Sequence, residues 1–174
     1  MSNGIKVHKR NGSIDPLNLE KMHRMVEEAT KDLAGVSASQ VEMKSGIQFY
    51  DGITTAEIQE ILIRSASDLI DLEHPNYQFV AARLLLFALR KSLYGKMRDL
   101  PHLENHIMTC TSGEVYDKDI FSKYSKEDIN KADGWIDHDR DFLFTYAGLR
   151  QESPPPSTEV SQLLYGHQIS MKRT

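Results

Sequence analysis

The chain has 174 residues, of which 40% are hydrophobic and 26% charged, a composition typical of one globular protein and not of a disordered one. Its net charge of −4 argues against broad nucleic-acid binding, and its longest apolar run is interrupted by Arg83, so we expect no membrane span. The lone Cys110 excludes an internal disulfide and zinc sites built from several thiolates. With no export signal at its start, we expect a cytoplasmic protein with neither a nucleic-acid nor a membrane partner.

Residues 5–16 are predicted to form a β-hairpin. Apolar residues such as Val7 alternate with polar ones in the first half, which is the pattern of a strand with one buried face. Asn11 and Gly12 would supply the pair of positive φ angles that a two-residue turn requires. Pro16 should end the return strand because it lacks a backbone donor.

Two helices are predicted next. Asn18 is a suitable N-cap for an amphipathic helix over residues 19–33, and Gly35 would end that helix in the left-handed region. Ser37 or Ser39 would cap a second, shorter helix.

A third strand is expected at residues 47–50 and would be closed by a turn at residues 51–52. Thr54 and Glu57 have the spacing of a capping box, which predicts that a helix begins there. The apolar face of this helix would reach Leu72.

The fourth predicted helix has Pro75 at its first position, a wide apolar stripe over residues 79–93 and Gly95 at its end. A stripe of that width indicates a helix buried on most sides. Less apolar helical segments are expected at residues 100–110 and 120–124, from a start at Ser125 with Asp128 in the first turn, and at residues 142–149.

These elements predict an α+β fold in which a small three-stranded sheet covers a four-helix bundle, followed by a helical adaptor. We expect a compact module at residues 1–95, the adaptor at 96–150 and a Pro-rich flexible tail at 151–174.

The basic residues near the predicted hairpin and helix ends favour a nucleotide-phosphate pocket. Lys9 stands at the end of a strand, Lys21 lies one turn into the first helix, and Lys91 lies near the end of the fourth. Thr55 falls in the first turn of a helix, where free N–H groups and the helix dipole favour an anion.

The same region offers an apolar slot for a base, formed by Leu17 together with Val7, Met22 and Ile58. Asp15 would accept hydrogen bonds from ribose hydroxyls. The alternative is that the lysines are merely solvated and that Thr54 and Thr55 only cap a helix, since there is no Gly-rich phosphate loop.

Several motifs in one order resemble a known family. They are VHKRNGS at 7–13, NLEKMHR at 18–24, IQFYDGITT at 47–55 and the helix at 77–95. Together these motifs resemble the ATP-cone, the module that opens the large (alpha) subunit of class Ia ribonucleoside-diphosphate reductase of bacterial or phage type. The similarity continues through WIDHDRD at 135–141 and FTYA at 144–147, and so covers about the first 150 residues.

The resemblance implies an allosteric site that reads ATP against dATP, with Mg²⁺ accompanying the nucleotide. By position it implies nucleotide contacts from Lys9, Asp15, Pro16, Leu17, Asn18, Leu19, Glu20, Lys21, Thr55 and Lys91. Some family members have histidines where this chain has Gln59 and Ala88, so inhibition by dATP is left open.

The family's reductase body is not found in this sequence. Ribonucleotide reduction needs three cysteines in one site, and the chain has Cys110 alone, so we expect no catalytic residues and no turnover by this chain. Two interpretations remain: an allosteric portion truncated or split from its core, or a docking fragment with vestigial nucleotide binding that complements a separately encoded catalytic half. The expected partners are the rest of the large subunit and the radical-generating small subunit.

Other groups of polar residues carry weaker hypotheses. Residues 137–141 (DHDRD) resemble a metal cluster, although an acidic helix start with an internal ion pair explains them more simply. His102 and His106 have the i, i+4 spacing of metal ligands but lack a third ligand. We therefore expect no metal site.

Overall fold

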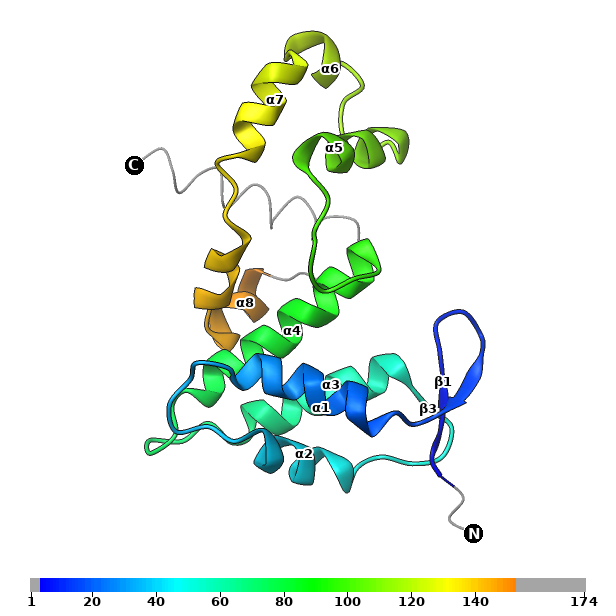
Figure 1. Cartoon of the computed structure of the whole chain (residues 1–174), viewed down its shortest axis with the longest axis vertical. Helices are drawn as coiled ribbons and strands as arrows, with labels where there is room; N and C mark the ends of the chain where they lie inside the picture. Colours follow the sequence, from blue (N-terminus) through cyan, green and yellow to red (C-terminus); the bar gives the residue numbers. More distant parts are fainter. Residues whose placement is uncertain (1–3, 153–174) are drawn as a thin grey trace. The chain divides into compact units, whose positions relative to one another are not determined.

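The computed structural model describes residues 4–152, which divide into two compact units (Figure 1). The first contains residues 4–88 together with Phe142–Arg150, and the second contains Leu89–Asp141 with residues 151–152. The predicted α+β class with a small three-stranded sheet is confirmed.

The sheet lies in the first unit and has the order β2-β1-β3. Its central strand β1 (Lys6–His8) pairs antiparallel with β2 (Ile14–Pro16), which confirms the hairpin. On its other side β1 pairs parallel with β3 (Ile53–Thr54). A parallel pair needs a long crossover, and the chain between β2 and β3 supplies it with two helices.

The hairpin turn differs from the predicted two-residue type. The Lys9 N–H donates to the Ser13 carbonyl (2.9 Å), and the Gly12 N–H donates to the Lys9 carbonyl (3.0 Å). Gly12 has a φ of +82°, whereas Asn11 is not among the residues with positive φ. The loop therefore has three residues and places its single left-handed position at glycine.

Helices α1 (Leu19–Thr30) and α2 (Ala38–Gly46) form the crossover and pack against each other. Asn18 caps α1 as predicted, but α1 ends before Gly35. Arg83 explains the early end, because its guanidinium donates to the carbonyls of Ala29 (3.2 Å) and Lys31 (2.6 Å). Ser37 is the N-cap residue of α2.

The predicted strand at residues 47–50 is wrong. Ile47 is 86% exposed, and the chain runs through a loop there until Ile53, which is fully buried beside Val7. The turn at residues 51–52 precedes the strand instead of closing it. Burial of Ile53 within the sheet outweighed the strand propensity of the preceding apolar and aromatic residues.

Helix α3 (Thr55–Ser67) begins with the predicted capping box between Thr54 and Glu57. It ends before Leu72, which is fully exposed, so the predicted apolar face was too long. Helix α4 (Tyr77–Tyr94) begins two residues after Pro75, and Gly95 ends it with a φ of +71° as expected.

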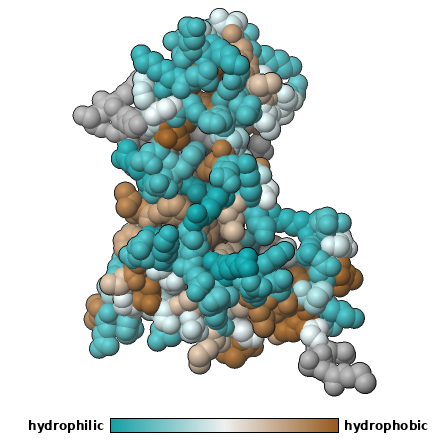
Figure 2. Space-filling model, viewed as in Figure 1, coloured by the Kyte–Doolittle hydropathy of each residue, from teal (hydrophilic) through white to brown (hydrophobic). Residues whose placement is uncertain are grey.

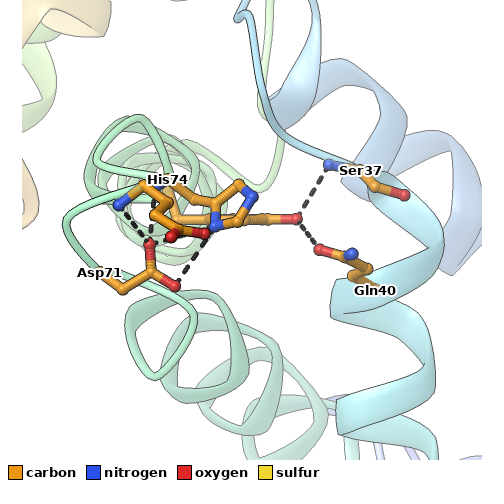
Figure 3. A network of polar contacts seen from close by, with 6 residues as sticks. Ser37, Gln40, Asp71 and His74 are labelled. Atoms are coloured by element: carbon orange, nitrogen blue, oxygen red, sulfur yellow. Dashed lines mark hydrogen bonds and ion pairs between the residues drawn. The ribbon is translucent and has the colours of Figure 1, made fainter.

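A buried tyrosine joins α2 to the start of α4 (Figure 3). The Tyr77 hydroxyl donates to the Gln40 side chain (2.5 Å) and accepts from the Ser37 N–H (3.0 Å). The hydroxyl thus satisfies the backbone donor at the α2 N-cap, where the Ser37 side chain makes no cap bond.

The core of the first unit is centred on α4, which is buried on most of its surface, as its wide apolar stripe predicted. Residues from other elements complete the core: Val7, Met22, Val26, Val41, Ile53, Leu62, Ile63 and Leu149. Figure 2 shows that apolar residues also reach the surface, and the most exposed of this unit include Ile47, Met43, Leu72 and Leu143.

The predicted helix at residues 142–149 is wrong in its limits. The chain forms a 3₁₀ helix, η1 (His138–Leu143), and then α8 (Tyr146–Glu152). Within the first unit the Phe142 ring packs edge-on against Phe87 (centroids 6.0 Å apart), and Arg150 pairs with Glu60 of α3 (2.8 Å).

The second unit contains α5 (Leu103–Ser112), α6 (Ile120–Lys123) and α7 (Lys126–Asp133). Leu103, Ile107 and Ile129 form its small core. Ser125 and Asp128 form a second capping box at the start of α7. Residues 153–174, which include nearly all of the predicted tail, lie outside the described residues. Among residues 4–152, no helix has the length and apolar character needed to cross a membrane.

Candidate functional site

Strand pairing brings two of the predicted phosphate-binding residues to neighbouring positions. In the parallel pair, Val7 lies opposite Ile53 and His8 lies opposite Thr54. Lys9 and Thr55 are therefore the residues that directly follow the paired part of each strand. Val7 and Ile53 point into the core, 4% and 0% exposed. Because side chains alternate along a strand, Lys9 leaves β1 on the same face as Val7. The backbone of Lys9 therefore lies at the end of β1, next to the strand that leads into α3.

Lys9 already has a partner within the hairpin. Its ammonium forms an ion pair with Asp15, which lies opposite Val7 on β2 and therefore on the same face of the sheet. The two side chains are 42% and 43% exposed, and a pair in that setting contributes at most about 1 kcal/mol. Exchanging this contact for one to a phosphate would cost little.

The segment from β2 to α1 contains most of the predicted contacts. The Leu17 N–H donates to the Ile5 carbonyl (2.8 Å) and extends the hairpin by one bond. Asn18 then caps α1 by accepting from the Lys21 N–H (2.8 Å). Glu20 pairs with Arg24 one turn later. Within residues 4–152, no hydrogen bond or ion pair joins the Lys21 amine to Lys9 or Thr55.

The start of α3 is ordered by Glu57. Its Oε2 accepts from the Thr54 N–H (2.8 Å) and from the Thr54 hydroxyl (2.7 Å), while Oε1 accepts from the Tyr50 hydroxyl (2.8 Å). The Thr54 side-chain bond, followed by the Thr54 backbone and Tyr50 bonds, lowers the pKa of Glu57. The N–H groups of Thr55 and Ala56 lie in the same turn and have no carbonyl one turn earlier in the helix.

The residues predicted to hold a base are buried. Val7, Met22 and Ile58 are 4%, 9% and 8% exposed, and Leu17 is half-buried. They belong to the core beneath the sheet, so their burial agrees equally with packing and with the wall of a slot.

Sequence reasoning did not place Gln59 among the site residues. It is 9% exposed, and its side-chain Nε2 has no hydrogen-bond partner among the described residues. A buried amide donor without a partner costs about 1–3 kcal/mol, so it requires an explanation. Gln59 stands three and four residues before Leu62 and Ile63, so it falls on the apolar face of the helix, and a polar residue at that position is the signal that marks it.

Lys91 lies in the last turn of α4 and is exposed. It belongs to the second unit, while Lys9, Lys21 and Thr55 belong to the first. Its inclusion in the site therefore stays a prediction.

The other polar candidates have structural partners in the second unit. Asp141 is 3% exposed and pairs with Arg90 of α4 (2.6 Å), so its main ion pair is not the internal one that we predicted. His102 pairs with Asp133 (2.7 Å), whereas His106 is buried against Cys110 (Nε2 to Sγ, 3.5 Å). Burial lowers the pKa of His106. No group of three metal-ligating side chains occurs within residues 4–152.

Comparison with known proteins places these residues in a family context. Residues 5–92 match the family described as "ATP cone domain". The chain is 44% identical over 151 residues to ribonucleoside-diphosphate reductase 1 subunit alpha of Escherichia coli K12, covering 87% of this chain and 20% of that protein. The Haemophilus influenzae subunit alpha gives the same identity and coverage. The enterobacteria phage T4 subunit alpha is 38% identical, with 84% of this chain and 19% of that protein covered. The chain thus spans about a fifth of the length of these relatives.

Proposed function

Because its residues 5–92 form an ATP-cone domain, the chain belongs to the ATP-cone family, and from this premise we propose that it is the allosteric, nucleotide-binding part of a ribonucleoside-diphosphate reductase large subunit. The similarity to the large subunit over 87% of the chain supports this assignment. In this proposal the chain binds an adenine nucleotide and releases it unchanged.

Two amines and one helix start of the first unit hold the nucleotide in the proposed site. Lys9 and Lys21 contact phosphate, and Thr55 donates from the first turn of α3, while a contact from Lys91 stays a prediction from the resemblance. Asp15 accepts from the ribose, and backbone and side-chain atoms of residues 16–20 complete the contacts. Val7, Met22 and Ile58 form the apolar wall against the base.

The observation that carries the proposal is the position of Lys9 beside the α3 N-terminus. The parallel register with β3 makes these two anion-seeking groups neighbours although 46 positions separate Lys9 from Thr55 in the sequence. In this proposal Mg²⁺ would accompany the triphosphate and offset part of its negative charge.

Regulation follows from linkage. A nucleotide that binds one conformation or assembly of the reductase more tightly than another shifts the population towards it by its difference in binding free energy. The proposed partners are the remainder of the large subunit and the radical-generating small subunit. The cytoplasmic location also stays a prediction.

Discrimination between ATP and dATP depends in this proposal on the groups that face the sugar and base. Gln59 supplies a buried amide where some family members have histidine. A neutral amide keeps hydrogen-bonding capacity but cannot take a proton, so in this proposal ATP binding persists while discrimination between ATP and dATP is weakened.

The test is isothermal titration of the full chain with ATP and with dATP. Replacing Lys9 by Ala should weaken the binding of both nucleotides by about tenfold, because one charge-assisted phosphate contact of about 1.5 kcal/mol is lost. Lys6→Ala is the matched control: Lys6 lies on the same strand but on the opposite face from Val7, and should leave the affinity unchanged.

Equal affinities of the Lys9→Ala and wild-type proteins would remove Lys9 from the site. A wild-type chain that binds neither nucleotide at millimolar concentration would overturn the proposed function. Association with a cysteine-bearing reductase polypeptide in that case would favour the docking alternative.

A further inference from the structure

The side chain of His23 lies between two carboxylates from different helices. Its Nδ1 is 2.7 Å from Glu42 Oε1 on α2, and its Nε2 is 3.1 Å from Glu27 Oε1 on α1. Both ring nitrogens thus face an acceptor. Neutral imidazole can donate from only one nitrogen, whereas the protonated ring donates from both. Both carboxylates therefore receive a hydrogen bond from His23 only when the imidazole ring is protonated on both nitrogens.

The surroundings of His23 are acidic. On α1, Glu27 lies one turn after it, and Glu20, paired with Arg24, lies three residues before it. On α2, Glu42 faces it with a side chain that is 22% exposed, while Lys44 turns away to the Asp68 carbonyl (3.1 Å). The Glu42 carboxylate is largely shielded from water, so its electrostatic attraction to a cationic partner is stronger than that of a fully solvated carboxylate.

These contacts raise the pKa of His23 above 6.5, and the hydrogen bond that the ring donates to Glu42 is the largest cause. A raised folded-state pKa means that the contact stabilises the fold fully below the unfolded pKa. The stabilisation is lost as pH rises through the folded pKa. The change therefore falls in the range from about pH 6.5 upwards, which includes neutral pH.

His23 is well placed to affect the nucleotide segment. Helix α1 begins within that segment, and Lys21 is two residues before His23. The other contacts of α1 with its neighbours are mostly apolar, through Met22, Val26 and Ala29, and such contacts have little directional preference. At its C-terminal end α1 is bound by Arg83, which does not titrate near neutral pH. In the N-terminal half of α1, the contact between His23 and Glu42 is a polar link to α2.

We propose that His23 is a positioning residue, a proton-dependent link between α1 and α2 that makes the affinity for an adenine nucleotide depend on pH. This inference rests on the proposed function, since the nucleotide segment is part of the same helix. The proton moves only between solvent and the His23 ring.

The link itself is tested without nucleotide. The pKa of His23 is measured in the full chain by following its ring resonances by NMR as pH is varied. We expect a value above 6.5 that falls towards 6.5 in Glu42→Gln and falls less in Glu27→Gln, because Glu42 makes the shorter contact. A wild-type value at or below 6.5 would overturn the proposal.

The effect on binding is tested by titrating ATP at pH 6.0 and pH 8.5. Relative to His23→Gln, the wild-type protein should bind ATP about two- to fivefold more tightly at pH 6.0 and equally at pH 8.5, the range expected of one exposed charged contact. Ionisation of ATP itself is common to both proteins and cancels in the comparison.

His74→Gln is the matched control, because His74 is another exposed histidine of the first unit that pairs with a carboxylate, Asp71 (3.1 Å, Figure 3), but within its own segment. It should follow the wild-type pH profile. If the ATP affinity of His23→Gln depends on pH in the same way as that of the wild type, His23 has no positioning role. That conclusion holds even if the NMR titration shows a raised pKa for His23. If the wild-type chain binds ATP at neither pH, the proposed function fails while the NMR result still decides the link.

Discussion

At the scale of single residues, some polar groups have complete hydrogen bonds, whereas others, Gln59 among them, have a buried atom without a partner among the described residues. Glu57 uses both oxygens, and the Tyr77 hydroxyl is bonded on both sides. Gln59 is buried nearby in sequence with its Nε2 unpartnered among the described residues. A binding protein can retain such a donor when its partner is a ligand, at the expense of stability in the free state.

Replacing Gln59 by Leu should therefore separate stability from binding. We expect the free energy of unfolding without nucleotide to rise by about 1 kcal/mol, because an unpaired amide gives way to an apolar group of similar size. ATP affinity should fall. Urea denaturation and calorimetric titration of the same preparation measure the two effects, and a loss of stability without nucleotide would show that the amide has a structural partner.

At the scale of elements, the two capping boxes show what short-range sequence can predict. Thr54 with Glu57 and Ser125 with Asp128 each form the reciprocal bonds that their spacing indicates. All atoms involved lie within four residues, so no information from elsewhere in the fold is needed. The end of α1 is the contrary case, because Arg83, 53 positions beyond Thr30, holds the carbonyls there.

Removing the first box by Thr54→Ala should cost about 1 kcal/mol of stability, because the side-chain acceptor for the Glu57 N–H is lost. The lowered pKa of Glu57 adds a pH signature. The Glu57 carboxylate stabilises the fold at pH values above its unfolded-state pKa. This stabilisation is lost as the pH falls through the lower pKa that Glu57 has in the folded state. The stability difference between wild type and variant, from urea denaturation, should therefore narrow below about pH 4. A constant difference over that range would exclude a role of the Glu57 charge in the cap.

The strand predicted at residues 47–50 failed for a related reason. Ile47, Phe49 and Tyr50 have strand propensity, but the place beside β1 goes to Ile53, whose side chain is fully buried. The same parallel register creates the Lys9–Thr55 neighbourhood. The sequence predicted that both residues contact phosphate, but it could not predict that they are neighbours. Their proximity depends on the pairing of β1 with β3, two strands 46 positions apart in the sequence.

At the scale of the whole molecule, the first unit is built from two separate stretches of chain. Phe142–Arg150 returns to it, where Phe142 packs on Phe87 and Leu149 is 3% exposed. The match to the ATP-cone family ends at residue 92, before this stretch, so it does not indicate that the stretch completes the core. Such long-range completion is not visible in local periodicity.

Leu149→Ala should destabilise the first unit by about 2–5 kcal/mol, as expected for a buried leucine. Leu143→Ala, six residues earlier, is the control, because Leu143 is 73% exposed and should change stability by less than about 0.5 kcal/mol. Hydrogen exchange should locate the loss to α1–α4. Equal effects of the two substitutions would show that the returning stretch does not support the core.

The two-part construction of the first unit has a consequence for biosynthesis. When Ala88 leaves the ribosome's catalytic centre, the side chains that will meet Leu149 have no partner there, and 61 more residues must be added. At ordinary elongation speeds this takes roughly 3–12 s. During that interval the nascent chain exposes apolar surface on α4, and chaperones that recognise such surface have time to bind before the unit closes.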